Sequence, residues 1–365
     1  MIQVSKPFIS PDERARVDQV LQSGMIASGA VTTEFEQKFA AYSQAKFGVA
    51  TSNGTTALHA ALLAIGIKPG DHVLTTPFTF IASTNSIAFC GAKPVFADID
   101  PKTYNLDPNA ARDVLKKRKD IKAILLVHLY GMACDMDAFL ELKKEFGVLL
   151  IEDCAQAHGA LYKDKKVGSM GDVSTFSFYA TKNMTTGEGG MVLTNEQKTA
   201  DLVRKLVNHG RTGQYEHDIL GYNYRMTNFA AAIGIGQLEK LDAGNKRRQA
   251  IAGMYNKEFA SLPWMTIPFV PSDRSHVYHQ YTIRLQKRDA LKLFLTDNQI
   301  GSFIVYPIPN CQQPLYKGTC DCESPNRCVC KVSGEAAREV LSIPVHPFLT
   351  DDEVRQVIAA IQKFH

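Results

Sequence analysis

The chain of 365 residues lacks a long apolar run and a strong excess of either charge. No segment approaches the roughly 20 apolar residues that a membrane-spanning helix needs. The start, MIQVSKPFIS, lacks the apolar core of a signal peptide. Lys and Arg number 41 against 37 Asp and Glu, so the net charge is only +4, without a basic stripe with interleaved aromatic residues. We therefore expect a cytoplasmic protein that binds neither membranes nor nucleic acids.

Internal repeats and low-complexity segments are also missing, and the first half of the chain instead alternates apolar runs with amphipathic stretches. Segments 55–66 and 136–147 are typical of amphipathic helices. The apolar runs are typical of short buried strands and cover 72–78, 94–100, 123–131, 147–153, 174–180 and 189–195. This alternation predicts an α/β fold with a mostly parallel central sheet that helices cover on both faces. Ligands of such sheets bind at the carboxyl ends of the strands.

The pattern changes in the last third of the chain. A long helical region covers 229–259, and a strand at 277–285, a helix at 288–299 and a strand at 301–307 follow it. A final helix begins at Asp351. We therefore predict a large domain over 1–245 and a small C-terminal α/β domain over 246–365.

The cysteines divide into two groups. Three stand alone in apolar surroundings, which is typical of buried reduced thiols: Cys90, Cys134 and Cys154. The others gather in the C-terminal third: Cys311, Cys320, Cys322, Cys328 and Cys330. The last four form two C-x-C pairs that could bind zinc, but structural zinc sites usually use C-x2-C spacing. We favour a cysteine-rich surface loop without a metal in a reducing compartment.

The segment SNGTTALHAALLA opens a helix directly after a strand, with Gly54, Thr55 and Thr56 in its first turn. Free backbone N–H groups and the helix dipole favour an anion at this position, and the two hydroxyl groups add donors. A common Ser/Thr helix cap would give the same pattern. By itself, this segment therefore does not predict a phosphate site. The prediction depends on the other segments described below.

The segment LLIEDCAQAHGA ends an apolar strand with Glu152 and Asp153. Because side chains alternate along a strand, we expect one of these two carboxylates to point inward. The buried carboxylate could form a salt bridge or cap a helix. It could also face the protonated ring nitrogen of a bound cofactor. Gln156 and His158 follow, and we expect both within hydrogen-bonding range of the same site.

The segment FSFYATKNMTTGEGGMVLTN places Lys182 between a strand and a glycine-rich turn. A surface lysine, a phosphate-binding lysine or a lysine that attacks a carbonyl would each fit. A helix-start phosphate site, a carboxylate ending one strand and a lysine after a later strand are together what pyridoxal phosphate needs. Burial near a cationic ring would also let the lysine move protons. Phe80 could stack on the ring, although an aromatic residue there is often plain core.

Taken together, the segments resemble the DegT-type sugar aminotransferases, which are pyridoxal-phosphate enzymes of the aspartate-aminotransferase fold (fold type I). The resemblance covers nearly the whole chain. Besides the segments above, it includes SGMIASGAVTTEFEQKFAAY, PFTFIASTNSI, VHLYGMACDMD, NHGR, GYNYRMTNFAAAIGIGQL, HVYHQYTIR and SIPVHPFLT.

The resemblance implies a role for each candidate residue. Lys182 would form the Schiff base, and Asp153 would hold the pyridine nitrogen. Gln156 would bind the phenolic oxygen, and Phe80 would stack on the ring. The first turn at Gly54, with Thr55, Thr56 and Ser177, would hold the phosphate. Asn223 in GYNYR would reach the phosphate of the partner subunit, which implies a homodimer with shared active sites.

The implied reaction moves an amino group from L-glutamate to a nucleotide-linked keto-sugar. TTGEGGM at 185–191 is similar to the perosamine synthases and predicts a 4-keto-6-deoxyhexose, with a 3-keto-sugar as the alternative. Arg211 and Arg225 are candidates for the diphosphate or for structural ion pairs. Cys311 departs from the family because relatives often carry histidine there. A dehydratase would replace Lys182 with histidine, and a non-catalytic regulator could lose Lys182 or Asp153.

Overall fold

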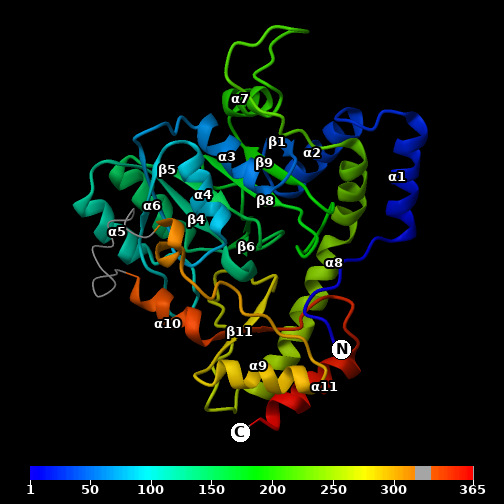
Figure 1. Cartoon of the computed structure of the whole chain (residues 1–365), viewed down its shortest axis with the longest axis vertical. Coiled ribbons are helices and arrows are strands. Elements are labelled where there is room, and N and C mark those ends of the chain that lie inside the picture. Colours follow the sequence, from blue (N-terminus) through cyan, green and yellow to red (C-terminus); the bar gives the residue numbers. More distant parts are fainter. Residues whose placement is uncertain (317–329, 365) are drawn as a thin grey trace.

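The computed structural model describes residues 1–316 and 330–364 and has a seven-stranded central sheet (Figure 1). The strand order is β1-β9-β8-β5-β4-β2-β3. Strand β9 runs antiparallel to both neighbours, and the remaining strand pairs are parallel. The strands are β1 Phe47–Thr51, β2 His72–Thr75, β3 Lys93–Phe96, β4 Ile121–Val127, β5 Leu149–Asp153, β8 Val173–Ser177 and β9 Gly190–Thr194. The predicted fold class is confirmed.

Helices cover both faces of this sheet, because its strands are apolar on both sides. One apolar core joins the sheet to α2, α5, α6 and the start of α8. The other core joins it to α3, α4 and α7. The helices are α1 Pro11–Ser23, α2 Ala30–Tyr42, α3 Gly54–Ala64, α4 Ile81–Phe89, α5 Pro108–Lys117, α6 Met136–Phe146, α7 Gln197–Val207 and α8 Asn228–Phe259. A small hairpin, β6 Leu161–Tyr162 with β7 Lys165–Lys166, lies outside the sheet.

Helix α8 connects the sheet to a third apolar core near the two chain termini (Figure 1). Its 32 residues span about 48 Å at 1.5 Å per residue. Its last turns pack against β10 Tyr281–Arg284, β11 Val340–Ile343, α9 Arg288–Asp297 and α11 Asp351–Gln362. Helix α10 covers Lys331–Glu339, and short 3-10 turns cover Leu129–Gly131, Asn310–Gln312 and Pro314–Tyr316. Ile2, from the N-terminus, also belongs to this core. The predicted boundary between the large and the small domain, at residue 245, stays a prediction.

The predicted strand at 301–307 is wrong. This segment makes a single bridge, between Phe303 and Ser342, instead of a ladder. Tyr306 has a φ of 61°, a left-handed conformation that interrupts an extended strand. The same turn lets the Tyr306 hydroxyl contact the Gln156 side chain at 2.6 Å. Within the described residues, no helix is both long and apolar enough to cross a membrane.

Candidate active site

The candidate residues meet at the carboxyl end of the sheet, where β5 ends at Asp153 and β8 ends at Ser177. Helix α3 begins at Gly54 directly beside Ser177. A Cβ atom on Gly54 would lie 2.7 Å from the Ser177 Cβ, which is too close for two carbon atoms. Only glycine therefore lets the first turn of α3 approach the end of β8 this closely.

The first turn of α3 has a complete cap. The Asn53 side chain accepts a hydrogen bond from the Thr56 N–H at 2.9 Å. The Thr56 hydroxyl accepts from the Asn53 N–H at 3.2 Å and donates to the Asn53 carbonyl at 2.8 Å. The capping residue is therefore Asn53, and not a serine or threonine as the alternative expected, with Thr56 as its reciprocal partner. The first N–H groups of a helix have no partner inside the helix, so anion binding at Gly54 and Thr55 stays a prediction.

Asp153 is buried, with 4% of its surface exposed. The Ser83 hydroxyl donates to its Oδ2 at 2.8 Å, and the Ala155 N–H donates to its Oδ1 at 3.1 Å. Burial raises the pKa of Asp153, and these two hydrogen bonds and the charge of Lys182 oppose the shift. The two donors hold the carboxylate in one orientation at the end of the strand.

The neighbouring Glu152 is buried as well. Successive side chains of β5 point to opposite faces, and apolar cores cover both faces of the sheet, so both carboxylates are buried. Glu152 accepts hydrogen bonds from the N–H groups of Gly168, Met170 and Gly171, and its Oε2 lies 3.1 Å from His128 Nε2. Burial alone would raise the pKa of Glu152, but these hydrogen bonds lower it. Glu152 therefore fixes the 168–171 loop on the other face of the sheet.

Lys182 lies in the loop that follows β8. Burial lowers its pKa from 10.5 to about 8, against the opposing attraction of Asp153. Its N–H donates to the Tyr179 carbonyl at 2.9 Å. The next residue holds this loop against α8, because the Asn183 amide donates to Asn245 Oδ1 at 2.9 Å and to the Val277 carbonyl at 3.1 Å. Lys182 is half-buried, and it lies close enough to the buried Asp153 for the charge of the carboxylate to act on its pKa. The catalytic role of the pair stays a prediction.

Gln156 bridges two elements of the site. Its Oε1 accepts from the Tyr130 N–H at 2.8 Å, and its Nε2 donates to the Tyr306 hydroxyl at 2.6 Å. His158 contacts Phe176 and Phe178, and burial lowers its pKa to about 3. The charge of Lys182 lowers this pKa further, so His158 lies close to Lys182, although neither of its ring nitrogens makes a side-chain hydrogen bond in the described part of the chain.

Two candidate residues are exposed on the single chain. Phe80, directly before α4, is 59% exposed. Asn223 is also exposed, in the segment between α7 and α8 that projects from the top of Figure 1. In this segment, Arg211 donates to the carbonyls of residues 213 and 214, and Arg225 Nη1 donates to Asn208 Oδ1 at 2.7 Å. Both arginines therefore have partners within their own segment.

Sequence reasoning missed Ser83 and Tyr306. Ser83 lies in the segment PFTFIASTNSI, which carries the family resemblance, whereas Tyr306 lies in no such segment. Ser83 follows Phe80 by three residues, but Phe80 is the exposed N-cap of α4 and Ser83 is buried, so the two side chains point in different directions. The spacing to Phe80 therefore gives no signal for Ser83. No sequence signal links Tyr306 to Gln156, because 150 residues separate them and only the turn at Tyr306 brings them together.

Among the described residues, one group has the composition of a metal site: His128, Glu152 and Cys154. The hydrogen-bond network already engages both ring nitrogens of His128, since Nδ1 accepts from the Cys134 N–H at 3.0 Å and Nε2 contacts Glu152. This group is therefore a structural network. Cys320, Cys322 and Cys328 lie outside the described residues, and the metal question there stays a prediction. Cys311 and Cys330 are buried beside Phe96.

The fold, with Lys182 and Asp153 at the carboxyl end of its central sheet, is that of enzymes of the aminotransferase class. The chain belongs to the DegT/DnrJ/EryC1/StrS aminotransferase family, whose sequence model matches residues 7–362. It is 35% identical, with a TM-score of 0.92, to the structure of DesV from S. venezuelae in complex with a ketimine intermediate. That match covers 96% of this chain and 93% of the other.

Related proteins also align with this chain over nearly its whole length, and their names describe different functions. The GDP-perosamine synthase of Caulobacter vibrioides is 41% identical, over 99% of this chain and 98% of its own. A pleiotropic regulatory protein of Geobacillus stearothermophilus is 39% identical, over 100% and 98%. The dTDP-3-amino-3,6-dideoxy-alpha-D-galactopyranose transaminase of Aneurinibacillus thermoaerophilus is 37% identical, over 95% and 94%.

Proposed function

We propose that the protein uses pyridoxal phosphate to transfer an amino group from L-glutamate to a keto-sugar carried on a nucleotide. The observation that carries this proposal is the placement of Lys182, in the loop after β8, beside Asp153 at the end of the neighbouring strand β5. Burial holds the pKa of Lys182 at about 8, so the lysine has an accessible neutral form. A neutral amine is the form that attacks a carbonyl.

The residues present fit pyridoxal phosphate. Lys182 would bind its aldehyde, and Asp153 would hold a proton on the ring nitrogen. Gly54 is the position where a side chain would close the space between α3 and Ser177, which fits a phosphate held by the helix start and the serine hydroxyl. Gln156 would contact the phenolic oxygen, and the exposed face of Phe80 is free to stack on the ring. When bound, the cofactor supplies an electron sink for the amino-acid α-carbon.

The side chains of the protein would transfer the proton and hold the reacting groups in position. Lys182 can accept and return a proton near neutral pH because its pKa is lowered. Asp153 keeps its orientation through Ser83, which donates at 2.8 Å. Gln156 is held in turn by Tyr306. Asp153 and Gln156 thus each have a partner from another segment that fixes their position.

For the acceptor, we propose a 4-keto-6-deoxyhexose on a nucleoside diphosphate. The loop TTGEGGM adjoins Lys182 and is compact, since the Thr185 hydroxyl and the Thr186 N–H both donate to the Phe178 carbonyl, at 3.1 and 2.9 Å. Its similarity to the perosamine synthases and the 41% identity to one of them support amination at carbon 4. The 37% identical transaminase named for a 3-amino sugar keeps carbon 3 as the alternative.

The test is a panel of nucleotide-linked 3-keto and 4-keto sugars with glutamate, with the new amine located by NMR. We expect the amine at carbon 4. An amine at carbon 3 would show that the loop does not determine the position. A Lys182→Ala variant should lose the yellow colour and the transamination, and borohydride should fix the cofactor on Lys182 in the parent. Parental turnover by the variant would refute the assignment of Lys182. Absence of turnover in the parent with every donor and acceptor of the panel would favour the regulator alternative, a role suggested by the name of one relative.

We also propose that the active enzyme is a homodimer in which Asn223 reaches the cofactor phosphate of the partner subunit. The exposure of Asn223 and Phe80 on a single chain supports this arrangement. Light scattering of the holoenzyme at assay concentration tests it. A fully active monomer would contradict the shared site.

A further inference from the structure

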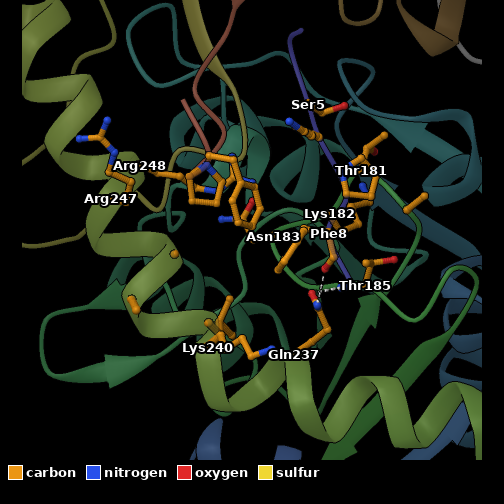
Figure 2. Close-up of a pocket in the computed structure, with 18 residues that line it drawn as sticks. Ser5, Phe8, Thr181, Lys182, Asn183, Thr185, Gln237, Lys240, Arg247 and Arg248 are labelled. Atoms are coloured by element: carbon orange, nitrogen blue, oxygen red, sulfur yellow. Dashed lines mark hydrogen bonds between the residues drawn. The ribbon is translucent and has the colours of Figure 1, made fainter. Parts of the chain in front are cut away.

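A pocket of about 270 Å³ lies on the side of the Lys182 loop that faces α8 (Figure 2). Four segments line it: the N-terminal residues 5–8, the loop at 180–185, α8 between residues 237 and 248, and residues 347–348. The candidate cofactor residues other than Lys182 do not line it. The pocket is therefore a separate compartment that shares one wall with the site described above.

The charge of this pocket is of one sign. None of its lining residues is acidic, and five are basic: Lys6, Lys182, Lys240, Arg247 and Arg248. Two of these have a carboxylate partner, since Lys240 contacts Glu13 at 3.0 Å and Arg247 contacts Asp351 at 2.7 Å. The cationic surplus near a buried lysine favours an anion in the pocket.

Arg248 gives the strongest indication that the pocket binds an anion. It is only 6% exposed, and its Nη1 makes long hydrogen bonds of 3.3 and 3.4 Å to the carbonyls of Tyr278 and Val345. Its Nε is buried without a hydrogen-bond partner in residues 1–316 and 330–364. A buried guanidinium with an unused donor and no carboxylate beside it is costly unless a ligand supplies the missing partner.

The size and walls of the pocket limit the ligand. Ligand pockets typically measure about 300–1,000 Å³, so this one suits a small metabolite better than a whole nucleotide-sugar. Phe8 and Phe348, with ring centroids 4.9 Å apart, and Leu241 add apolar surface for a short carbon chain. In residues 1–316 and 330–364, Lys6 and Arg248 have no ion-pair partner, which leaves two cations of the pocket for two anionic groups.

We propose that this pocket binds the carboxylates of a small dicarboxylate, namely the amino donor L-glutamate and the keto acid formed from it. This inference rests on the proposed function, because the donor must react next to Lys182. It also explains the choice of a dicarboxylic donor, since a single carboxylate would leave part of the basic lining without a partner.

Isothermal titration of the holoenzyme with glutarate, a dicarboxylate without a reactive amine, tests the proposal. Lys6→Gln removes an exposed cation at the pocket, and Arg248→Gln removes the buried guanidinium with the unused donor. We expect the Kd of glutarate to rise about tenfold in each variant, as for the loss of a hydrogen bond to a charged group. Lys246→Gln is the matched control, because Lys246 is a neighbouring exposed residue of α8 that does not line the pocket. Its Kd should equal that of the parent.

Butyrate and pyrophosphate distinguish the ligand classes. Butyrate should bind more weakly than glutarate. If pyrophosphate binds more tightly than glutarate and the variants weaken pyrophosphate alone, the pocket serves a phosphate and the proposal is wrong. Equal glutarate affinity in the parent and both variants would also refute it. Failure of the keto-sugar assay would overturn the proposed function, while glutarate binding would still report on the pocket.

Discussion

The pKa of Lys182 gives a direct prediction for the cofactor-free protein. Burial lowers it from 10.5 to about 8, which corresponds to about 3 kcal/mol at 1.36 kcal/mol per unit. At pH 7 the neutral fraction of Lys182 is then about 9%, compared with about 0.03% for an ordinary lysine. Because the neutral amine reacts, attachment of pyridoxal phosphate should be about 300-fold faster than at an ordinary lysine.

The assay mixes cofactor-free protein with pyridoxal phosphate in a stopped-flow instrument between pH 6 and pH 10.5. The visible absorbance of the bound cofactor gives the rate, which should rise with pH and level off above pH 8. Lys182→Arg is the control and should give no covalent attachment. A rate that continues to rise towards pH 10.5 would show that Lys182 is not buried as the structure places it.

Protein stability gives an independent measure of the same shift. Between about pH 8 and pH 10.5, the unfolded chain keeps a proton on Lys182 that the folded chain has lost. The free energy of unfolding should therefore increase with pH across this window, by up to about 3 kcal/mol from this residue. Lys182→Met should lack this increase in urea titrations of the cofactor-free protein. The same slope in both proteins would contradict the shift.

Three further predictions concern the rest of the site. Ser83→Ala removes the hydrogen bond to Asp153 and should lower kcat by about tenfold with little change in KM, measured with glutamate and the keto-sugar. Gly54→Ala should release the cofactor on gel filtration, because its Cβ meets β8, whereas Gly253→Ala in open space should keep the cofactor and stabilise α8 by about 0.5–1 kcal/mol. Asn223→Asp should weaken cofactor retention in the dimer by charge repulsion, measured by dialysis, and unchanged retention would separate Asn223 from the phosphate.

The sequence predicted the elements of the central sheet because their signals are local. Parallel strands buried on both faces are continuous apolar runs, and β4 and β5 were recognised from their composition. The segment at 301–307 looked similar, but the left-handed turn at Tyr306 depends on a partner 150 residues away. The spacing of apolar residues and the composition of a segment do not predict such a long-range contact.

By itself, the sequence determined the fold class and the order of Lys182, Asp153 and the helix start at Gly54, because each lies at the end of a recognisable strand or helix. The tertiary structure decided how these residues are supported and charged. Burial sets the pKa of Lys182, the Ser83 hydroxyl orients Asp153, and loop 168–171 lets Glu152 be buried as well. Solvent exclusion and hydrogen bonds between distant segments exist only after the chain has folded, so sequence patterns carry no direct record of them.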